Sequence, residues 1–177
     1  MSSVDLYTDG SALKNGNSAG GLGYIIQYTE QGESEFDSMS TRTIEGNQGF
    51  RLTTNNRMEI MAAIYGINAI IENVQSGILA GINTIALYSD SAYLCNAINQ
   101  KWIAKWASNN WMTSGFQGRQ PTPVKNKDLW EQIIEIQDKL VNMGISLTVT
   151  HVQGHADNAL NNRADQLAVA ASNASSD

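Results

Sequence analysis

The first quarter of the chain alternates apolar and polar side chains in a way that predicts β-strands. The alternation is clearest over residues 4–9 and returns over 22–28, and a period of two places successive side chains on opposite faces of a strand. A weaker third strand is predicted over 35–41, and residues 45–53 are expected to form a loop. Because the connections are short and residues 15–21 contain three glycines, an antiparallel meander is expected.

Apolar segments with helical spacing follow this meander. Residues 57–74 predict a long helix, with Asn55 or Asn56 offering the N-cap. A second helix is predicted over 127–143, capped by Asn126 and closed by Gly144. The remaining elements are expected to be strands over 84–89 and 145–152 and helices over 91–99, 101–108 and 158–171. This order indicates a single α/β domain spanning residues 1–177, in which helices cover a mixed sheet.

Composition favours a globular cytoplasmic protein. Hydrophobic residues make up 42% of the 177 residues and charged residues 16%. The chain has no apolar run of roughly 18 residues, as a bilayer-spanning helix requires, and its start lacks the pattern of a signal peptide. A single cysteine, Cys95, makes no internal disulfide and is interpreted as a small buried side chain on a helix. The polar tail, residues 172–177, is expected to be frayed.

Charge is unevenly distributed along the chain. The net charge is −6, from 17 acidic and 11 basic residues, which taken alone argues against a nucleic-acid partner. Residues 101–127, however, contain no acid, so the remainder carries −11. The five bases of this basic segment are Lys101, Lys105, Arg119, Lys125 and Lys127. The segment is either a phosphate-binding surface or a solvated loop that lacks acids; Trp102 and Trp106, four residues apart, favour packing over stacking on bases.

Four carboxylates occur in apolar surroundings. Glu59 lies among small and apolar residues of the long helix, and Asp9 and Asp90 each end an apolar strand. Asp165 lies on an apolar face of the last helix. If the strands that end at Asp9 and Asp90 are parallel neighbours, both acids emerge at the same sheet edge. A common explanation is a site for hard divalent cations, which carboxylates and water bind; individually, each acid could instead be a turn, cap or solvated residue.

Several motifs together resemble the type 1 ribonuclease H family, part of the ribonuclease H-like superfamily. They occur in the family's order and cover nearly the whole chain, so they are far more specific than one short aspartate motif. They are residues 7–11 (YTDGS), 53–59 (TTNNRME), 88–91 (YSDS), 123–130 (PVKNKDLW), 152–155 (VQGH) and, ten residues later, Asp165.

The resemblance implies a ribonuclease H-like fold, with a five-stranded mixed sheet flanked by helices, and an endonuclease that hydrolyses the RNA strand of RNA–DNA hybrids. Two Mg²⁺ or Mn²⁺ ions would position a water at the scissile phosphate and stabilise the leaving 3′ oxygen, so products would carry 5′-phosphate and 3′-hydroxyl ends. His155 would shuttle a proton or assist product release, whereas His151 is interpreted as structural. The carboxylates implied to hold the ions are Asp9, Glu59, Asp90 and Asp165.

The resemblance also implies how the hybrid would be bound. Polar residues would contact the minor groove, where RNA offers 2′-hydroxyls, and a pocket would hold a phosphate of the DNA strand. Residues 101–127 resemble the family's basic handle, although residues 107–109 lack the expected bases, which predicts weaker and less salt-sensitive binding. The implied groove residues are Asn15, Asn17, Asn55 and Asn56, the pocket residues Thr54 and Asn126, and the handle residues Lys101 and Lys105. Asn55 and Asn126 could instead serve as helix N-caps.

Three other functions remain open at this point. The chain could be another metal nuclease of this fold that cuts DNA, a non-catalytic binding module, or a ribonuclease H domain of a reverse transcriptase. The TNNR motif at residues 54–57 and the handle argue against the first, and the presence of all four carboxylates argues against the second. The handle favours a free-standing enzyme over the third. The sequence shows no membrane segment and no obligate protein partner, so a monomer is expected.

Overall fold

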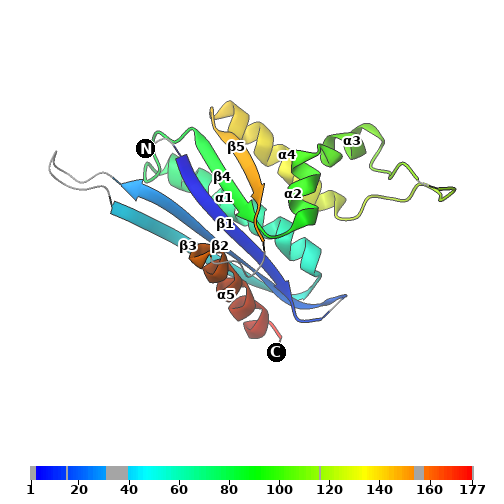
Figure 1. The fold of residues 1–177 in the computed structure, drawn as a ribbon, viewed down its shortest axis with the longest axis horizontal. Coiled ribbons are helices and arrows are strands. Elements are labelled where there is room, and N and C mark those ends of the chain that lie inside the picture. Colours follow the sequence, from blue (N-terminus) through cyan, green and yellow to red (C-terminus); the bar gives the residue numbers. More distant parts are fainter. Residues whose placement is uncertain (1–2, 15, 31–39, 116, 154–157, 177) are drawn as a thin grey trace.

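The computed structural model describes residues 3–14, 16–30, 40–115, 117–153 and 158–176. Five strands form one sheet in the order β3-β2-β1-β4-β5 (Figure 1). β1 pairs antiparallel with β2 and β2 antiparallel with β3, whereas β1–β4 and β4–β5 are parallel. The predicted meander and mixed sheet are therefore confirmed. The strands are β1 (Ser3–Ala12), β2 (Ser18–Glu30), β3 (Ser40–Thr53), β4 (Thr84–Ser89) and β5 (Ser146–His151).

Helices cover both faces of the sheet. α1 packs against one face, where Leu6, Ile26 and Leu87 are fully buried together with Ile60 and Ile67 of the helix. α5 lies across the opposite face over β1 to β3, and α2 and α4 gather beside β5 (Figure 1). The helices are α1 (Asn55–Gln75), α2 (Ala92–Asn99), α3 (Trp102–Ser108), α4 (Lys127–Asn142) and α5 (Ala159–Ala174).

The third strand is where the predicted elements are wrong. β3 runs from Ser40 to Thr53 and pairs with β2, so residues 45–53 are strand and not loop. Two glycines in this stretch suggest a turn, yet packing requires them. A Cβ at Gly46 would lie 2.4 Å from the ring of Tyr24, and one at Gly49 would lie 2.5 Å from the carbonyl oxygen of Ala171. Most of the strand predicted over 35–41 lies outside the described residues.

Helix ends show two further differences from the sequence interpretation. Thr54, and not Asn55 or Asn56, caps α1, because its side chain accepts a hydrogen bond from the Arg57 backbone N–H. Asn126 does occupy the N-cap position of α4, but its backbone is left-handed (φ 63°) and its side chain makes no capping hydrogen bond. The side chain of Asn126 is therefore available for another contact.

Packing explains the aromatic residues of the basic segment. Trp106 lies between Trp102 and Trp130, with ring centroids 6.0 and 5.8 Å apart, and Trp130 is fully buried. The prediction that these tryptophans pack is confirmed. Cys95 is likewise buried, on α2.

The C-terminal segment is more ordered than expected. α5 continues to Ala174, and Ser172 is fully buried and donates a hydrogen bond to the Ser11 carbonyl. Fraying from residue 172 is therefore wrong for residues 172–174. Across the described ranges, no helix is both long and apolar enough to cross a bilayer.

Candidate active site

The register of two parallel strands brings the first two acids together. β1 and β4 are neighbours in which Thr8 pairs with Ser89. Asp9 and Asp90 each follow that pair by one residue, so the two acids lie together just beyond the end of the β1–β4 pairing, as the sequence pattern predicts. Asp9 does not end its strand, however, because β1 continues to Ala12 in its pairing with β2. Asp90 begins the turn into α2, and Ser91 caps this helix by accepting a hydrogen bond from the Leu94 N–H.

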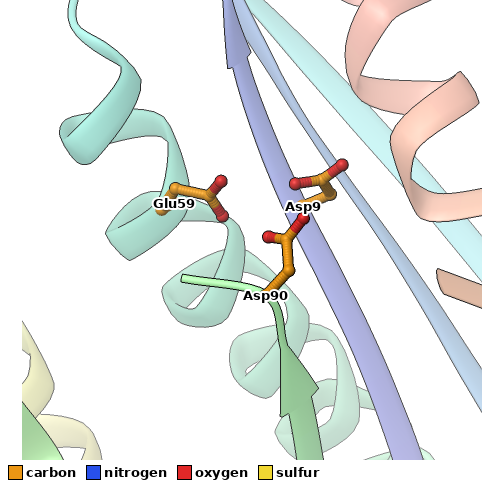
Figure 2. Close-up of side chains that lie close together, drawn as sticks. All are labelled: Asp9, Glu59 and Asp90. Atoms are coloured by element: carbon orange, nitrogen blue, oxygen red, sulfur yellow. The ribbon is translucent and has the colours of Figure 1, made fainter. Parts of the chain in front are cut away.

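A glycine brings α1 close enough to add the third acid. Gly10 follows Asp9, and a Cβ at this position would lie 2.4 Å from the backbone nitrogen of Glu59 and 2.5 Å from the carbonyl carbon of Met58. Both distances are shorter than real Cβ contacts, so only glycine lets the helix backbone rest directly on β1. Figure 2 shows the consequence: Glu59 points from α1 toward Asp9 and Asp90.

The three carboxylates form a tight and largely buried cluster. Each of Asp9, Glu59 and Asp90 offers an oxygen, and these oxygens all lie within 4.8 Å of one another. Asp9 and Glu59 are only 4% and 6% exposed, whereas Asp90 is half-buried. Glu59 Oε2 is buried, and no described residue forms a hydrogen bond with it. A buried carboxylate oxygen that lacks a partner is costly, so this geometry favours a cation among the three groups.

Burial and like charges raise the pKa of two of these acids. Burial, a hydrogen bond to Asp165 and the charges of Asp90 and Asp165 raise the pKa of Asp9 to about 8, although the Gly10 N–H at 2.9 Å opposes the shift. Burial, followed by the charges of Asp9 and Asp90, raises the pKa of Glu59 well above its ordinary value. Carboxylates crowded in this way hold protons or bind cations, and their hard oxygen atoms suit Mg²⁺ or Mn²⁺.

The fourth predicted acid approaches from the other face of the sheet. Asp165 lies half-buried on α5 and contributes to the raised pKa of Asp9, but it is not among the three mutually close groups. Glycines in β2 allow this approach: a Cβ at Gly23 would lie 2.4 Å from the Ala164 carbonyl oxygen, and one at Gly21 would lie 2.4 Å from that of Ala168. Backbone contact therefore fixes α5, and with it Asp165, against the sheet.

His151 supports the backbone that carries Asp90. It ends β5, and its Nε2 lies 3.1 Å from the Asp90 carbonyl oxygen. A carbonyl only accepts hydrogen bonds, so Nε2 carries the proton in this contact. This contact agrees with the interpretation of His151 as structural. His155 and Asn15 lie outside the described residues.

An open polar pocket of about 490 Å³ adjoins the N-terminal ends of α1 and α4. It brings together Thr54, Asn55, Asn56 and Asn126, four of the predicted substrate-binding residues. Three further residues line the pocket: Gly16, Arg57 and Lys125. The sequence interpretation named Lys125 only as a base of the basic segment and assigned no binding role to Gly16 or Arg57. Such a pocket, lined by amides, a hydroxyl and cationic side chains at helix N-termini, suits an anion.

The other predicted binding residues lie around this pocket and on the handle. Asn17 is exposed beside Gly16 in the β1–β2 connection. Lys101 and Lys105 are exposed at the start and in the middle of α3. Lys105 also lines an open groove of about 600 Å³ beside Trp106, so a packed tryptophan still presents part of its ring to this groove.

The chain is similar to known ribonucleases H along nearly its whole length. The family profile described as RNase H matches residues 1–173. Ribonuclease H of Clostridium botulinum is 39% identical over 170 residues, covering 95% of this chain and 94% of that protein. Ribonuclease H of Chlorobium phaeobacteroides is 40% identical over 168 residues, with the same coverage.

Solved structures show the same fold. The crystal structure of LC9-RNase H1, described as a type 1 RNase H with the type 2 active-site motif, matches with a TM-score of 0.70 and 26% identity. The match covers 99% of this chain and 74% of that one. LC11-RNase H1 in complex with an RNA/DNA hybrid matches with a TM-score of 0.61 and 19% identity, over 97% of both chains.

Proposed function

The chain belongs to the ribonuclease H family of nucleases, and from this membership we propose that it hydrolyses the RNA strand of RNA–DNA hybrids in a reaction that requires divalent metal. The observation that carries the proposal is the cluster of Asp9, Glu59 and Asp90, whose oxygens lie within 4.8 Å of one another. Among the residues that the structure describes, neither an ion pair nor a full set of hydrogen bonds explains this cluster, since Glu59 Oε2 is buried without a partner there. A cation-binding site does.

The donor set fits two Mg²⁺ or Mn²⁺ ions. Asp9, Glu59 and Asp90 supply hard oxygen atoms in one cluster, and Asp165 adds a carboxylate beside Asp9. When bound, such ions supply Lewis acidity to the scissile phosphate and lower the pKa of an attacking water. The protein holds its acids in place before any ion arrives, because β1, β4, α1 and α5 fix their backbones.

The pocket and the acid cluster both lie along the N-terminal turns of α1, and this arrangement bears on which strand of the hybrid each would bind. Thr54 caps this helix and lines the polar pocket, while Glu59, on the same helix, reaches the acid cluster. One strand's phosphate in the pocket would therefore fix how far the other strand lies from the acids. The chain's relative LC11-RNase H1 has been crystallised with an RNA/DNA hybrid. We assign the DNA phosphate to the pocket and the RNA strand to the acid cluster.

The products would carry 5′-phosphate and 3′-hydroxyl ends, and His155 would act in proton transfer or product release. His155→Ala should therefore slow turnover without abolishing it. The expected slowing is roughly 10- to 100-fold, toward the lower end of what general acid–base groups contribute. Turnover would be measured at saturating hybrid. An unchanged rate would remove His155 from the reaction.

The proposal is tested with an RNA–DNA hybrid whose RNA strand is labelled at its 5′ end. Cleavage is measured with Mg²⁺, with Mn²⁺ and with EDTA, beside single-stranded RNA, duplex RNA and duplex DNA. We expect metal-dependent cutting of the hybrid RNA alone. Cutting of duplex DNA would favour a different nuclease of this fold. A folded protein that binds the hybrid without cutting it under any metal would favour a binding module.

A further inference from the structure

We propose that Arg57 and Asp128 form a positioning pair, which turns the side-chain amide of Asn126 so that its donor faces the polar pocket. This inference rests on the proposed function, because it concerns how the pocket binds a phosphate of the hybrid. It gives Arg57 a different role from the one its charge suggests, since its guanidinium acts on Asn126 and not on the phosphate.

The pair joins the first turns of two helices. The Arg57 guanidinium donates two parallel hydrogen bonds to the Asp128 carboxylate, of 3.0 Å to Oδ1 and 2.8 Å to Oδ2. This forked arrangement holds the plane of the guanidinium more firmly than a single contact would. The same Nη1 atom also donates to Asn126 Oδ1 at 3.2 Å. Asp128 therefore aims Arg57, and Arg57 in turn holds Asn126.

The chemistry of arginine decides which way the amide faces. A guanidinium has donors and no acceptor, so the Asn126 atom beside it must be the carbonyl oxygen and not the nitrogen. The Nδ2 donors are thereby directed away from Arg57. Asn126 lines the pocket, and within the described part of the chain its Nδ2 donates no hydrogen bond to another residue. Phosphate oxygens only accept hydrogen bonds, so this orientation is the one that binds them.

The backbone of Asn126 is arranged for the same purpose. Its left-handed conformation (φ 63°) is one that asparagine tolerates better than most residues. Its carbonyl accepts from the N–H groups of Leu129 and Trp130 at 2.9 and 3.0 Å, which starts α4 without help from the side chain. The side chain is thus freed from capping and held by Arg57.

The opposite charges of Arg57 and Asp128 indicate that this pair is not itself the anion-binding group. The Asp128 carboxylate raises the pKa of Arg57, and the Arg57 guanidinium holds the pKa of Asp128 below its ordinary value. Both groups therefore stay ionised and nearly cancel each other at the pocket. An acid beside a phosphate site weakens phosphate binding by repulsion, so Asp128 would be a disadvantage there unless its contact with Arg57 served another purpose.

The two possible roles of Arg57 predict opposite effects of Asp128→Ala on hybrid binding. If Arg57 binds phosphate directly, Asp128→Ala releases its charge and tightens hybrid binding. If Arg57 positions Asn126, the same substitution loosens the amide and weakens binding, even though it removes a negative charge. The matched control is Asp138→Ala, which removes the same charge from an exposed position on the same helix.

Binding of a fluorescent RNA–DNA hybrid in EDTA would be measured by anisotropy, with kcat and KM measured separately in Mg²⁺. We expect Asp128→Ala to raise Kd and KM about fivefold, as loss of one net hydrogen bond implies, with kcat unchanged and Asp138→Ala near wild type. Asn126→Ala should weaken binding by a similar factor, and Asn126→Ala with Asp128→Ala no further. If Asp128→Ala compromises folding, Asp128→Asn, which keeps one acceptor oxygen, should give a smaller weakening.

An unchanged or lower Kd in Asp128→Ala would overturn the positioning role, as would independent, multiplying effects of the two substitutions. Binding in EDTA is measured without cleavage, so it is independent of catalysis. If the wild-type protein binds the hybrid and does not cut it, the proposed function fails, while the positioning role is still decided by the Kd values.

Discussion

The first turns of α1 adjoin two regions with opposite electrostatics, the acid cluster at the sheet edge and the polar pocket. At the sheet edge, Glu59 lies against Asp9 and Asp90, no salt bridge in the described part of the chain involves these acids, and the pKa values of Asp9 and Glu59 are raised. At the polar pocket, Arg57 is already paired with Asp128, and the pKa of Asp128 is lowered. One region gathers like charges that protons or a cation can balance, whereas in the other region the charge of Arg57 is already balanced by Asp128. In the proposed function, repulsion between carboxylates prepares the metal site, and orientation of a side-chain amide prepares the phosphate site.

Removing an acid from the sheet edge should have the largest effect on activity. Asp9→Asn, Glu59→Gln or Asp90→Asn should reduce cleavage by a factor on the order of a thousand or more, since metal-ion catalysis contributes several kcal/mol. Folding should survive, because each substitution relieves repulsion between carboxylates. Cleavage of end-labelled hybrid and circular dichroism would measure the two effects. Asp138→Asn, on the exposed side of α4, is the control, and full activity in any of the three variants would refute their assignment as metal ligands.

A methyl group at Gly10 should damage both regions together, because both depend on how α1 rests on β1. Gly10→Ala places a Cβ 2.4 Å from the Glu59 backbone, and we expect the free energy of unfolding to fall by about 3 kcal/mol or more. Urea denaturation would measure it. Gly77→Ala is the control, since Gly77 also lies near α1 but has φ 90° and open space around it, which predicts a loss of only about 1 kcal/mol. Equal losses would contradict the close-contact argument.

The pH dependence of stability should distinguish protonation of the acid cluster from binding of a metal ion there. Because the pKa of Asp9 rises from 3.8 to about 8 on folding, the folded state keeps a proton that the unfolded chain has released. This contribution is complete below about pH 4 and is lost as pH rises through 8. In EDTA, Tm should therefore fall over this pH range, and the free energy of unfolding should fall by at most a few kcal/mol. Mg²⁺ should reduce the fall, and Asp9→Asn should flatten it. A metal-independent profile would contradict a cation site.

The smallest effect is expected at the handle, where exposed lysines act over a distance. Lys101→Ala and Lys105→Ala should each raise KM about twofold at low salt and lower the slope of log Kd against log salt by about 1. Lys139→Ala, in the last turn of α4, is the control. Equal effects of all three substitutions would mean that general charge, and not the handle, attracts the hybrid.

Much of the acid cluster was predictable from local patterns. The apolar stretches that lead into Asp9 and Asp90 predict two strands, and their parallel pairing places the two acids side by side. The end of the first strand was not predictable in this way, because β1 continues past Asp9 to Ala12 along β2. The single-domain organisation, cytoplasmic location, monomeric state and assigned roles of the site residues stay predictions.

What local patterns missed depends on contacts between distant segments. Gly46 and Gly49 suggest a turn by composition, and only the Tyr24 ring and the α5 backbone explain why glycine is needed within a strand. Asparagine is a residue type that often caps helices, but the Asn126 side-chain oxygen instead accepts a hydrogen bond from Arg57, 69 residues earlier. Local sequence patterns reflect a residue's neighbours along the chain. At these three positions, contacts with distant segments determine the local structure instead.

The glycine contacts that seat α5 have a consequence for the order in which the protein is made. Asp9 leaves the ribosome long before Asp165, which lies 156 residues further along the chain. Until α5 emerges and lies against Gly21 and Gly23, the sheet edge lacks its fourth carboxylate. A nascent chain, or one truncated before α5, therefore carries an incomplete set of acids, and the full set forms only once translation has passed the last helix.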